Sequence, residues 1–195
     1  SYRDANGCDT SENIALTNPP DLSGAISISS QVSCFGSCDG VLDFQVNNIL
    51  TGTSPYTYSL DGGPFQNSSS FSGLCGNTTY SITVRDANNC EYSTTKFLAE
   101  PTAVSFSYTT SDYNGFEISC NGFSDGEITF SNILGGTPNF SFSIDGGVTF
   151  GSDSIFNSSN GSSISAGTYD LQVQDGAGCL TNQITLSVTE PMPFT

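Results

Sequence analysis

Residues 80–90 read YSITVRDANNC, and this stretch decides the fold. Tyr80, Ile82 and Val84 alternate with polar residues. Successive side chains of a β-strand point to opposite faces, so the pattern predicts a strand with one buried face. The Asp, Ala and Asn residues that follow are typical of a tight turn. The stretch therefore predicts a strand, a turn and then a cysteine, Cys90.

The same string occurs three times in the chain. Residues 2–8 read YRDANGC and residues 169–179 read YDLQVQDGAGC. The closing cysteines, Cys8, Cys90 and Cys179, are 82 and 89 residues apart. A period of this length is typical of a domain rather than of one turn of a solenoid. The sequence therefore predicts tandem domains.

Other landmarks keep the same register and set the boundaries of the repeats. VSCFGSCDG at 32–40 matches ISCNGFSDG at 118–126, NNILTGTSPYTYSLDGG at 47–63 matches SNILGGTPNFSFSIDGG at 131–147, and AEP at 99–101 matches TEP at 189–191. We expect the C-terminal remnant of a preceding repeat at 1–19, complete repeats at 20–101 and 102–191, and the start of a next repeat at 192–195. The chain is then a piece of a longer array.

Each complete repeat is predicted to be all-β. YTYSL at 56–60 and FSFSI at 140–144 alternate like residues 80–84, and Gly, Asn and Asp residues between such runs favour hairpin turns. Six or seven short strands per repeat, without a convincing helical stretch, indicate an immunoglobulin-like Greek-key β-sandwich. We therefore expect tandem sandwich domains with no significant helix.

Two tyrosines favour the sandwich more specifically. Tyr80 and Tyr169 each follow a Gly-containing corner at the head of a regular strand, as in the tyrosine corner of Greek-key sandwiches. In that interpretation the hydroxyl group bonds to backbone across the corner. The alternative is that each Tyr is simply a good strand residue.

Composition excludes several classes of function. The chain of 195 residues has 19 acidic and only three basic side chains, so its net charge of −16 repels the phosphates of nucleic acids. No apolar run approaches the ~20 residues that cross a bilayer, so membrane insertion is not expected. The chain lacks histidine and has one lysine, which leaves few general bases, and we predict no catalytic residues and no enzyme.

The seven cysteines follow the repeats. Cys34 matches Cys120, and Cys90 matches Cys179, so each repeat has one equivalent pair. These matches predict the disulfides Cys34–Cys90, Cys120–Cys179 and, as an extra bridge of the first repeat, Cys38–Cys75, with the partner of Cys8 missing from the chain. Zinc is not expected without histidine or a second close cysteine pair. Disulfides persist in oxidising surroundings, so we expect an extracellular protein.

The chain resembles the SprB repeat family of Bacteroidota surface adhesins. The resemblance rests on VSCFGSCDG, GTSPYTYS, TYSITVRDANNC, ISCNGFSDGEI, GTPNFSFS, TYDLQVQDGAGC and TEP, and covers residues 32–101 and 118–191, plus a partial copy in 1–20. It implies type IX secretion, attachment to the bacterial cell surface, and a role in adhesion, surface filaments or gliding motility. The extra Cys38 and Cys75 and the insertion SDYNGF at 111–116 depart from the family pattern.

Calcium is the one candidate cofactor. Acidic residues occur in Gly- and Asn-rich turns, where backbone carbonyl oxygens could complete a calcium shell. The candidates are Asp39, Asp86, Asp125 and Asp175. The alternative is that each Asp caps the backbone of its own turn.

A covalent glycan is a further candidate feature. DSI at 153–155 resembles the Asp, Ser/Thr, aliphatic motif for O-glycosylation in Bacteroidota, with Ser154 as acceptor. The alternative is an unmodified serine in a loop.

Two functions remain open. In the first, the repeats are rigid, disulfide-stapled spacers of a long surface filament, whose partners are neighbouring repeats or other copies. The short AEPT connection at 99–102 then predicts two repeats end to end, roughly 80 Å long. In the second, the repeats are lectin-like and bind surface polysaccharides by stacking Tyr113, Phe116 and Phe123 on sugar rings.

Overall fold

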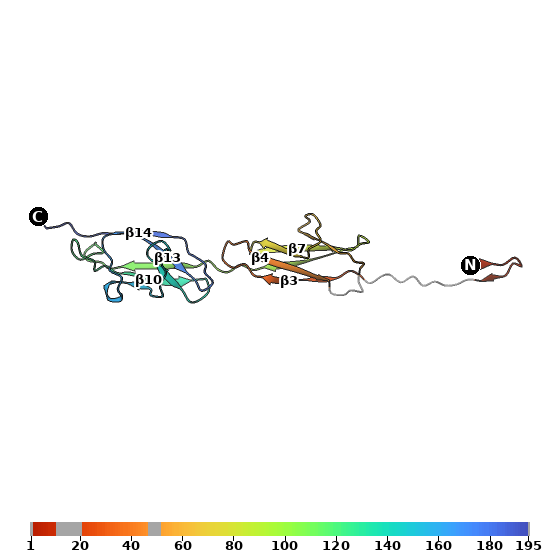
Figure 1. Ribbon diagram of the computed structural model, residues 1–195, viewed down its shortest axis with the longest axis horizontal. Coiled ribbons are helices and arrows are strands. Elements are labelled where there is room, and N and C mark those ends of the chain that lie inside the picture. Colours follow the sequence, from red (N-terminus) through yellow and green to blue (C-terminus); the bar gives the residue numbers. More distant parts are fainter. Residues whose placement is uncertain (1, 11–20, 47–51, 195) are drawn as a thin grey trace. The chain divides into compact units, whose positions relative to one another are not determined.

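The computed structural model describes residues 2–10, 21–46 and 52–194 (Figure 1). These parts of the chain form short strands and a single 3-10 turn, η1 (Ser158–Asn160). The strands are β1 (Tyr2–Arg3), β2 (Asp9–Thr10), β3 (Gly24–Ser30), β4 (Gly40–Val46), β5 (Thr57–Leu60), β6 (Ser70–Leu74), β7 (Thr78–Arg85), β8 (Glu91–Leu98), β9 (Ser105–Thr110), β10 (Ile128–Leu134), β11 (Ser141–Ser143), β12 (Ile155–Phe156), β13 (Gly167–Gln174) and β14 (Ile184–Val188).

The two complete repeats have the same strand order. In the first, one sheet has the order β3-β4-β6 and the other β5-β7-β8. In the second, the orders are β9-β10-β12 and β11-β13-β14. Strands one, two and four of each repeat thus form one sheet and strands three, five and six the other, which is the immunoglobulin arrangement A-B-E and C-F-G. The predicted all-β, immunoglobulin-like sandwich is confirmed.

The strand at residues 78–85 buries the predicted face. Antiparallel pairing of β5 with β7 aligns Tyr58 with Val84 and Leu60 with Ile82. Tyr80, Ile82 and Val84 are buried. Burial of such side chains stabilises the fold by roughly 1.5 to 3 kcal/mol each. The period-two pattern of the sequence therefore produces the core face of β7.

The second repeat encloses a core of its own. Phe130 on β10 is buried, and its ring centroid lies 5.2 Å from that of Phe106, 5.1 Å from that of Phe142 and 5.8 Å from that of Phe156. The tilted rings are at the separation that favours aromatic pairs. Aliphatic residues of both sheets and of the loops between strands complete this core, namely Ile118, Ile128, Ile164, Leu171, Val173, Leu186 and Val188.

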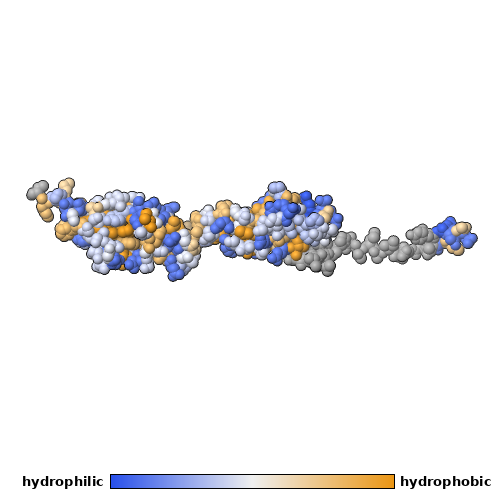
Figure 2. Space-filling view, in the orientation of Figure 1, coloured by the Kyte–Doolittle hydropathy of each residue, from blue (hydrophilic) through white to orange (hydrophobic). Residues whose placement is uncertain are grey.

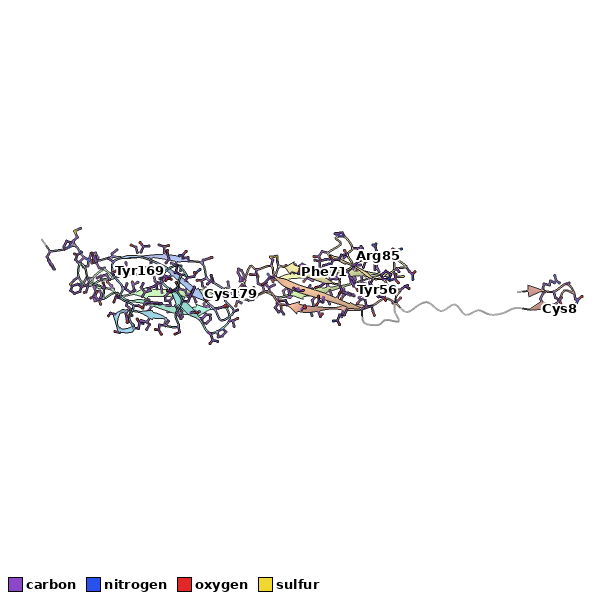
Figure 3. All side chains as sticks on the ribbon, in the orientation of Figure 1. Cys8, Tyr56, Phe71, Arg85, Tyr169 and Cys179 are labelled. Carbon is purple, nitrogen blue, oxygen red and sulfur yellow. A yellow bond between two sulfur atoms is a disulfide. The ribbon has the colours of Figure 1, made fainter. Side chains whose placement is uncertain are left out.

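Figure 3 shows Tyr169, which forms the predicted tyrosine corner. Its hydroxyl group donates to the backbone oxygen of Ser165 at 3.0 Å and accepts from the Ser165 N–H at 3.0 Å. The corner interpretation is therefore confirmed in the second repeat, while the Tyr80 side chain is buried in the first.

The sheets keep to the predicted repeats. Strands β3 to β8 lie within 20–101, β9 to β14 within 102–191, and no sheet in the described parts of the chain mixes the two sets. Residues 11–20 and 195 lie outside the described residues, and with them the predicted boundary at 19–20.

The chain separates into two compact units that are not the two repeats. One comprises Ser1–Ser27, Asp43–Ser70 and Tyr80–Lys96, and the other comprises Ile28–Leu42, Phe71–Thr79 and Phe97–Thr195. Three segments of the first repeat, 28–42, 71–79 and 97–101, are therefore grouped with the whole second repeat.

Apolar side chains also remain at the surface. The space-filling view shows apolar residues scattered among hydrophilic ones on the visible face (Figure 2). In the described segments, no helix is long and apolar enough to cross a membrane.

Candidate functional site

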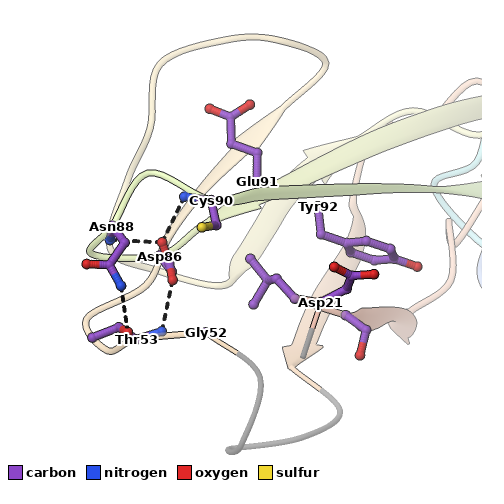
Figure 4. Close-up of a pocket in the computed structure, with 10 residues that line it drawn as sticks. Asp21, Gly52, Thr53, Asp86, Asn88, Cys90, Glu91 and Tyr92 are labelled. Carbon is purple, nitrogen blue, oxygen red and sulfur yellow. Dashed lines mark hydrogen bonds between the residues drawn. The ribbon is translucent and has the colours of Figure 1, made fainter. Parts of the chain in front are cut away.

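The cysteine at the end of the opening string is positioned by an aspartate. Asp86 Oδ1 accepts the N–H groups of Asn88 and Cys90 at 2.9 and 2.8 Å, and its Oδ2 accepts that of Thr53 at 2.9 Å (Figure 4). The Asp86 N–H donates to the Cys90 oxygen at 3.0 Å, and Asn89 takes a positive φ of 64°. The Asp86–Cys90 loop is therefore closed by its own aspartate.

The same loop is built in the second repeat. Asp175 Oδ1 accepts from Ala177 and Cys179 at 2.9 and 2.8 Å, and its Oδ2 accepts from Thr137 at 2.8 Å. Gly178 has the positive φ, 87°. Cys90 and Cys179 are thus held in matching backbone frames.

A third copy closes the N-terminal hairpin. Asp4 Oδ1 accepts from Asn6 and Cys8, both at 2.9 Å, and Gly7 has a φ of 86°. The string that occurs three times in the sequence therefore forms the same type of loop each time.

These hydrogen bonds lower the pKa of the carboxyl groups. For Asp86 the Thr53 N–H is the largest cause, and the N–H groups of Cys90 and Asn88 add to it. For Asp175 burial is the largest influence and acts upward, but the combined N–H donors outweigh it and hold the pKa below its usual value. Both groups are ionised acceptors at neutral pH.

The four calcium candidates are not brought together. Asp39 and Asp125 lie in another loop type, where they accept the N–H groups of Ser33 and Ser119 at 3.0 and 3.2 Å. Each candidate thus points at N–H donors, whereas calcium requires oxygen ligands. Across the described ranges, no three His, Cys, Asp or Glu side chains form a group that could hold a metal ion. The hydrogen bonds fit the alternative interpretation, in which each Asp caps its own turn.

The cysteine of the other loop type is held by a glutamate. The Gly36 N–H donates to Glu100 Oε1 at 2.6 Å, and the Ser37 N–H donates to the Cys34 oxygen at 3.0 Å. Gly36 has a φ of 76°, which favours glycine. Glu100 belongs to AEP, the segment that connects the repeats. This hydrogen bond therefore links the connecting segment to the Cys34 loop.

The loop of Cys120 is built in the same way. The Gly122 N–H donates to Glu190 Oε2 at 2.7 Å, and the Phe123 N–H donates to the Cys120 oxygen at 3.1 Å. Gly122 has a φ of 78°. The role of these glutamates was not predicted, although Glu-Pro recurs after the last strand of each repeat and was the available signal.

The disulfide pairing differs from the prediction. The structure joins Cys34 to Cys179, with Cα atoms 5.6 Å apart, and does not contain Cys34–Cys90 or Cys120–Cys179. Cys90 and Cys120 are exposed thiols. The remaining bridge is Cys38–Cys75. Cys8 is also an exposed thiol.

The length of β8 explains why Cys34 does not pair with Cys90. Cys90 directly precedes β8, whereas the Cys34 loop is bonded to Glu100, which follows β8. The eight residues of β8 span about 26 Å at 3.3 Å per residue. Two cysteines separated by a whole strand cannot approach the ~6 Å between Cα atoms that a disulfide needs. The predicted partners Cys90 and Cys34 are therefore held at opposite ends of β8.

The connection between the repeats packs around the Cys34–Cys179 bond. Figure 3 labels Cys179, and a cleft beside this bond is lined by Phe35, Leu180 and residues 101–104. The Gly136 N–H donates to the Thr102 oxygen at 3.2 Å, and Val104 packs against the second core. The segment after Pro101 is therefore fixed on the second repeat, just as Glu100 is fixed on the Cys34 loop.

The three predicted stacking residues do lie together. Tyr113, Phe116 and Phe123 line one groove of about 580 Å³, together with Cys120 and the last described residues. The Tyr113 N–H donates to the Phe116 oxygen at 2.7 Å, which closes the inserted loop. The structure thus places an aromatic surface beside a free thiol.

Ser154, the predicted glycan acceptor, is half-buried just before β12. Its backbone oxygen accepts the Phe130 N–H at 2.8 Å. Glycosylation of Ser154 stays a prediction.

The carboxyl groups do not favour acid–base catalysis. In the described segments, every Asp or Glu whose pKa is shifted has it lowered, because the carboxyl group accepts hydrogen bonds from nearby N–H and hydroxyl groups. A general acid at neutral pH requires a raised pKa.

Comparisons with known proteins show only distant similarity. No family model and no curated protein matches the chain. The chain is similar to the three N-terminal domains of the Highly Immunogenic Outer Capsid protein (Hoc) of bacteriophage RB49, with 16% identity and a TM-score of 0.44 over 86% of this chain and 59% of that one. It is also similar to fibronectin(III)-like modules of Clostridium thermocellum CbhA, with 12% identity and a TM-score of 0.33 over 85% of this chain and 94% of that one. The chain thus spans about three fifths of the first of these structures, and because both TM-scores are below 0.5, the fold assignment rests on the strand order.

Proposed function

We propose that the chain is a structural spacer in an extracellular array of repeats, with neighbouring repeats tied by a covalent bond. The observation that carries the proposal is Cys34–Cys179, which links a loop of the first repeat to a loop of the second. Such a bond prevents the two repeats from being pulled apart while the sulfurs remain joined. The disulfides also support an oxidising location outside the cytoplasm.

The segment between the repeats supports the same function. Glu100 is bonded to the Cys34 loop, and Thr102 to Gly136 of the second repeat. A connection that is bonded on both sides of Pro101 has little freedom to swing. The resemblance to SprB repeats supports the proposal of a spacer at a bacterial cell surface, in an adhesive or gliding-motility protein exported by type IX secretion.

Single-molecule stretching tests the spacer function. The oxidised chain is held by thiol-independent tags at its two ends and extended until it unfolds. The Cys34–Cys179 bond keeps the segment between the two cysteines, with a sequence separation of 145, from being extended. We therefore expect reductant to release roughly 500 Å of additional length.

A matched variant isolates the contribution of this bond. In Cys34→Ser/Cys179→Ser, only the Cys38–Cys75 bridge with its separation of 37 residues remains, so the gain falls to roughly 130 Å. Equal extension of the oxidised original chain with and without reductant would contradict the proposal.

Carbohydrate binding is a second candidate function, because the three predicted aromatics share one groove. Exposed rings in a groove can stack on sugars. We expect, on this second function, retention of the chain on agarose and loss of retention in Tyr113→Ala/Phe116→Ala. Val148→Ala, an exposed apolar residue outside that groove, is the matched control.

A further inference from the structure

Two of the free cysteines have counterparts that are bonded to each other. Cys120 occupies the position of Cys34, and Cys90 occupies the position of Cys179. Cys34 and Cys179 form the bond between the two repeats. Cys120 and Cys90 are therefore the same two half-sites without their partners in this chain.

The backbone around each free thiol matches that around its bonded counterpart. The Gly122 to Glu190 hydrogen bond at 2.7 Å reproduces the Gly36 to Glu100 bond at 2.6 Å. Because the same type of hydrogen bond to a glutamate fixes both loops, the backbone holds Cys120 in the same way as Cys34.

The Cys90 loop matches the Cys179 loop just as closely. The N–H of each cysteine donates to the aspartate of its own loop at 2.8 Å. Asp86 also accepts the N–H of Thr53, and Asp175 that of Thr137, which is the matching threonine of its own repeat. The loops of Cys90 and Cys120 therefore already have the same hydrogen bonds as the loops of their bonded counterparts.

The surface around Cys120 is apolar and open. Phe116 is 37% exposed, Phe123 54%, Met192 89%, and Phe194 is fully exposed. Phe194 occupies the position of Val104, which packs against the core of the second repeat. A repeat that follows the connection at Pro191 as the second repeat follows Pro101 would cover Phe194 in the same way.

We propose that Cys120 is the attachment site for the cysteine of the Asp-x-x-x-Cys loop of another repeat of this type, and that Cys90 is the matching half-site for another Cys34-type loop. The groove beside Cys120 is then the docking face for that repeat. This inference rests on the proposed function and extends it, because a disulfide of the Cys34–Cys179 type would then join each pair of neighbouring repeats in an array.

Bond formation needs an oxidant, which a small-molecule disulfide such as oxidised glutathione supplies. The Cys120 thiolate attacks one sulfur of the reagent and releases one glutathione thiolate. The thiolate of the incoming cysteine then attacks the Cys120 sulfur of the mixed disulfide and releases the second. The two cysteine thiols lose two protons and two electrons in total, and one oxidised glutathione becomes two thiols.

A chain with a duplicated second repeat tests the proposal. Residues 1–191 are followed by a second copy of residues 102–195, so that the added copy follows Pro191. This adds two cysteines to the seven of the chain. After oxidation with glutathione redox buffer, we expect the number of free thiols to stay at three, as in the original chain. A peptide map should join Cys120 to the cysteine of the added copy that corresponds to Cys179.

A variant of the duplicated chain is the control. With Cys120→Ser, the incoming cysteine has no partner, and the count should rise to four free thiols. Five free thiols in the duplicated chain without this change would overturn the proposal, and retention on agarose that Tyr113→Ala abolishes would then assign the groove to carbohydrate. The same peptide map reports Cys34–Cys179, so this inference can fail while the proposed function stands.

Discussion

At the scale of single residues, aspartates organise the loops that present the cysteines. Asp175 is nearly buried and accepts hydrogen bonds from Thr137, Ala177 and Cys179. The sequence contained the Asp-x-x-x-Cys spacing but left two interpretations open, calcium ligand or turn cap. Spacing alone does not show where a carboxylate points, and the observed N–H donors favour the cap.

Asp175→Asn tests this role. The amide keeps the shape of the side chain but loses the charge and replaces one acceptor oxygen with a donor. We expect the variant to lower the free energy of unfolding by about 1.5 to 3 kcal/mol, the range for hydrogen bonds to charged groups. Denaturant unfolding provides the measurement. Asp153→Asn, an exposed residue, is the control and should change stability by less than about 0.5 kcal/mol. An equal effect of both changes would argue against the cap.

Acid sensitivity follows from the same chemistry. The pKa of Asp145 is lowered to about 2, first by the Ser143 hydroxyl at 2.6 Å and then by the Thr149 hydroxyl at 2.6 Å. A carboxyl group with a lowered pKa in the folded state stabilises the fold above its unfolded pKa of about 4 and loses this contribution as the pH falls toward 2.

We therefore expect a melting temperature that is constant from pH 7 to 5 and falls between pH 4 and 2. Calorimetry in buffers of equal ionic strength measures it. Asp145→Asn should lower the melting temperature at pH 7 and reduce the fall. A melting temperature that rises on acidification would contradict the assignment.

At the scale of elements, alternation predicts the strands because a half-buried strand imposes it on the sequence. Tyr80, Ile82 and Val84 were predicted to share a face and are buried together on β7. Short strands are harder to predict: β12 has only two residues, Ile155 and Phe156, too few to show a period. Its pairing with β10 comes from tertiary contact rather than local pattern.

The tyrosine corner offers a test at this scale. Tyr169→Phe removes a hydroxyl group with two hydrogen bonds of 3.0 Å to the Ser165 backbone. We expect a loss of about 1 to 2 kcal/mol in the free energy of unfolding, from two bonds of ordinary strength. The control is Tyr113→Phe, whose hydroxyl group lies 3.5 Å from the Asp125 oxygen and should contribute little. Equal losses in chemical denaturation would mean that the corner has no special role.

At the scale of the whole molecule, the repeat pattern identifies equivalent cysteines but not which copies touch. Pairing within a repeat and pairing between neighbours give each cysteine the same type of partner, so the sequence cannot separate them. The deciding quantity is the length of β8, which places Cys90 and the Cys34 loop at opposite ends of one strand. Unpaired Cys90 and Cys120 are a consequence of pairing between neighbours.

A disulfide map of the oxidised chain directly tests whether the two repeats are joined by a covalent bond. The free thiols are blocked with an alkylating reagent, the chain is cleaved without reduction, and the linked peptides are identified by mass spectrometry. We expect one linked pair that contains Cys34 and Cys179, a second that contains Cys38 and Cys75, and alkylated Cys8, Cys90 and Cys120. Linked peptides that join Cys34 to Cys90 and Cys120 to Cys179 would contradict this expectation.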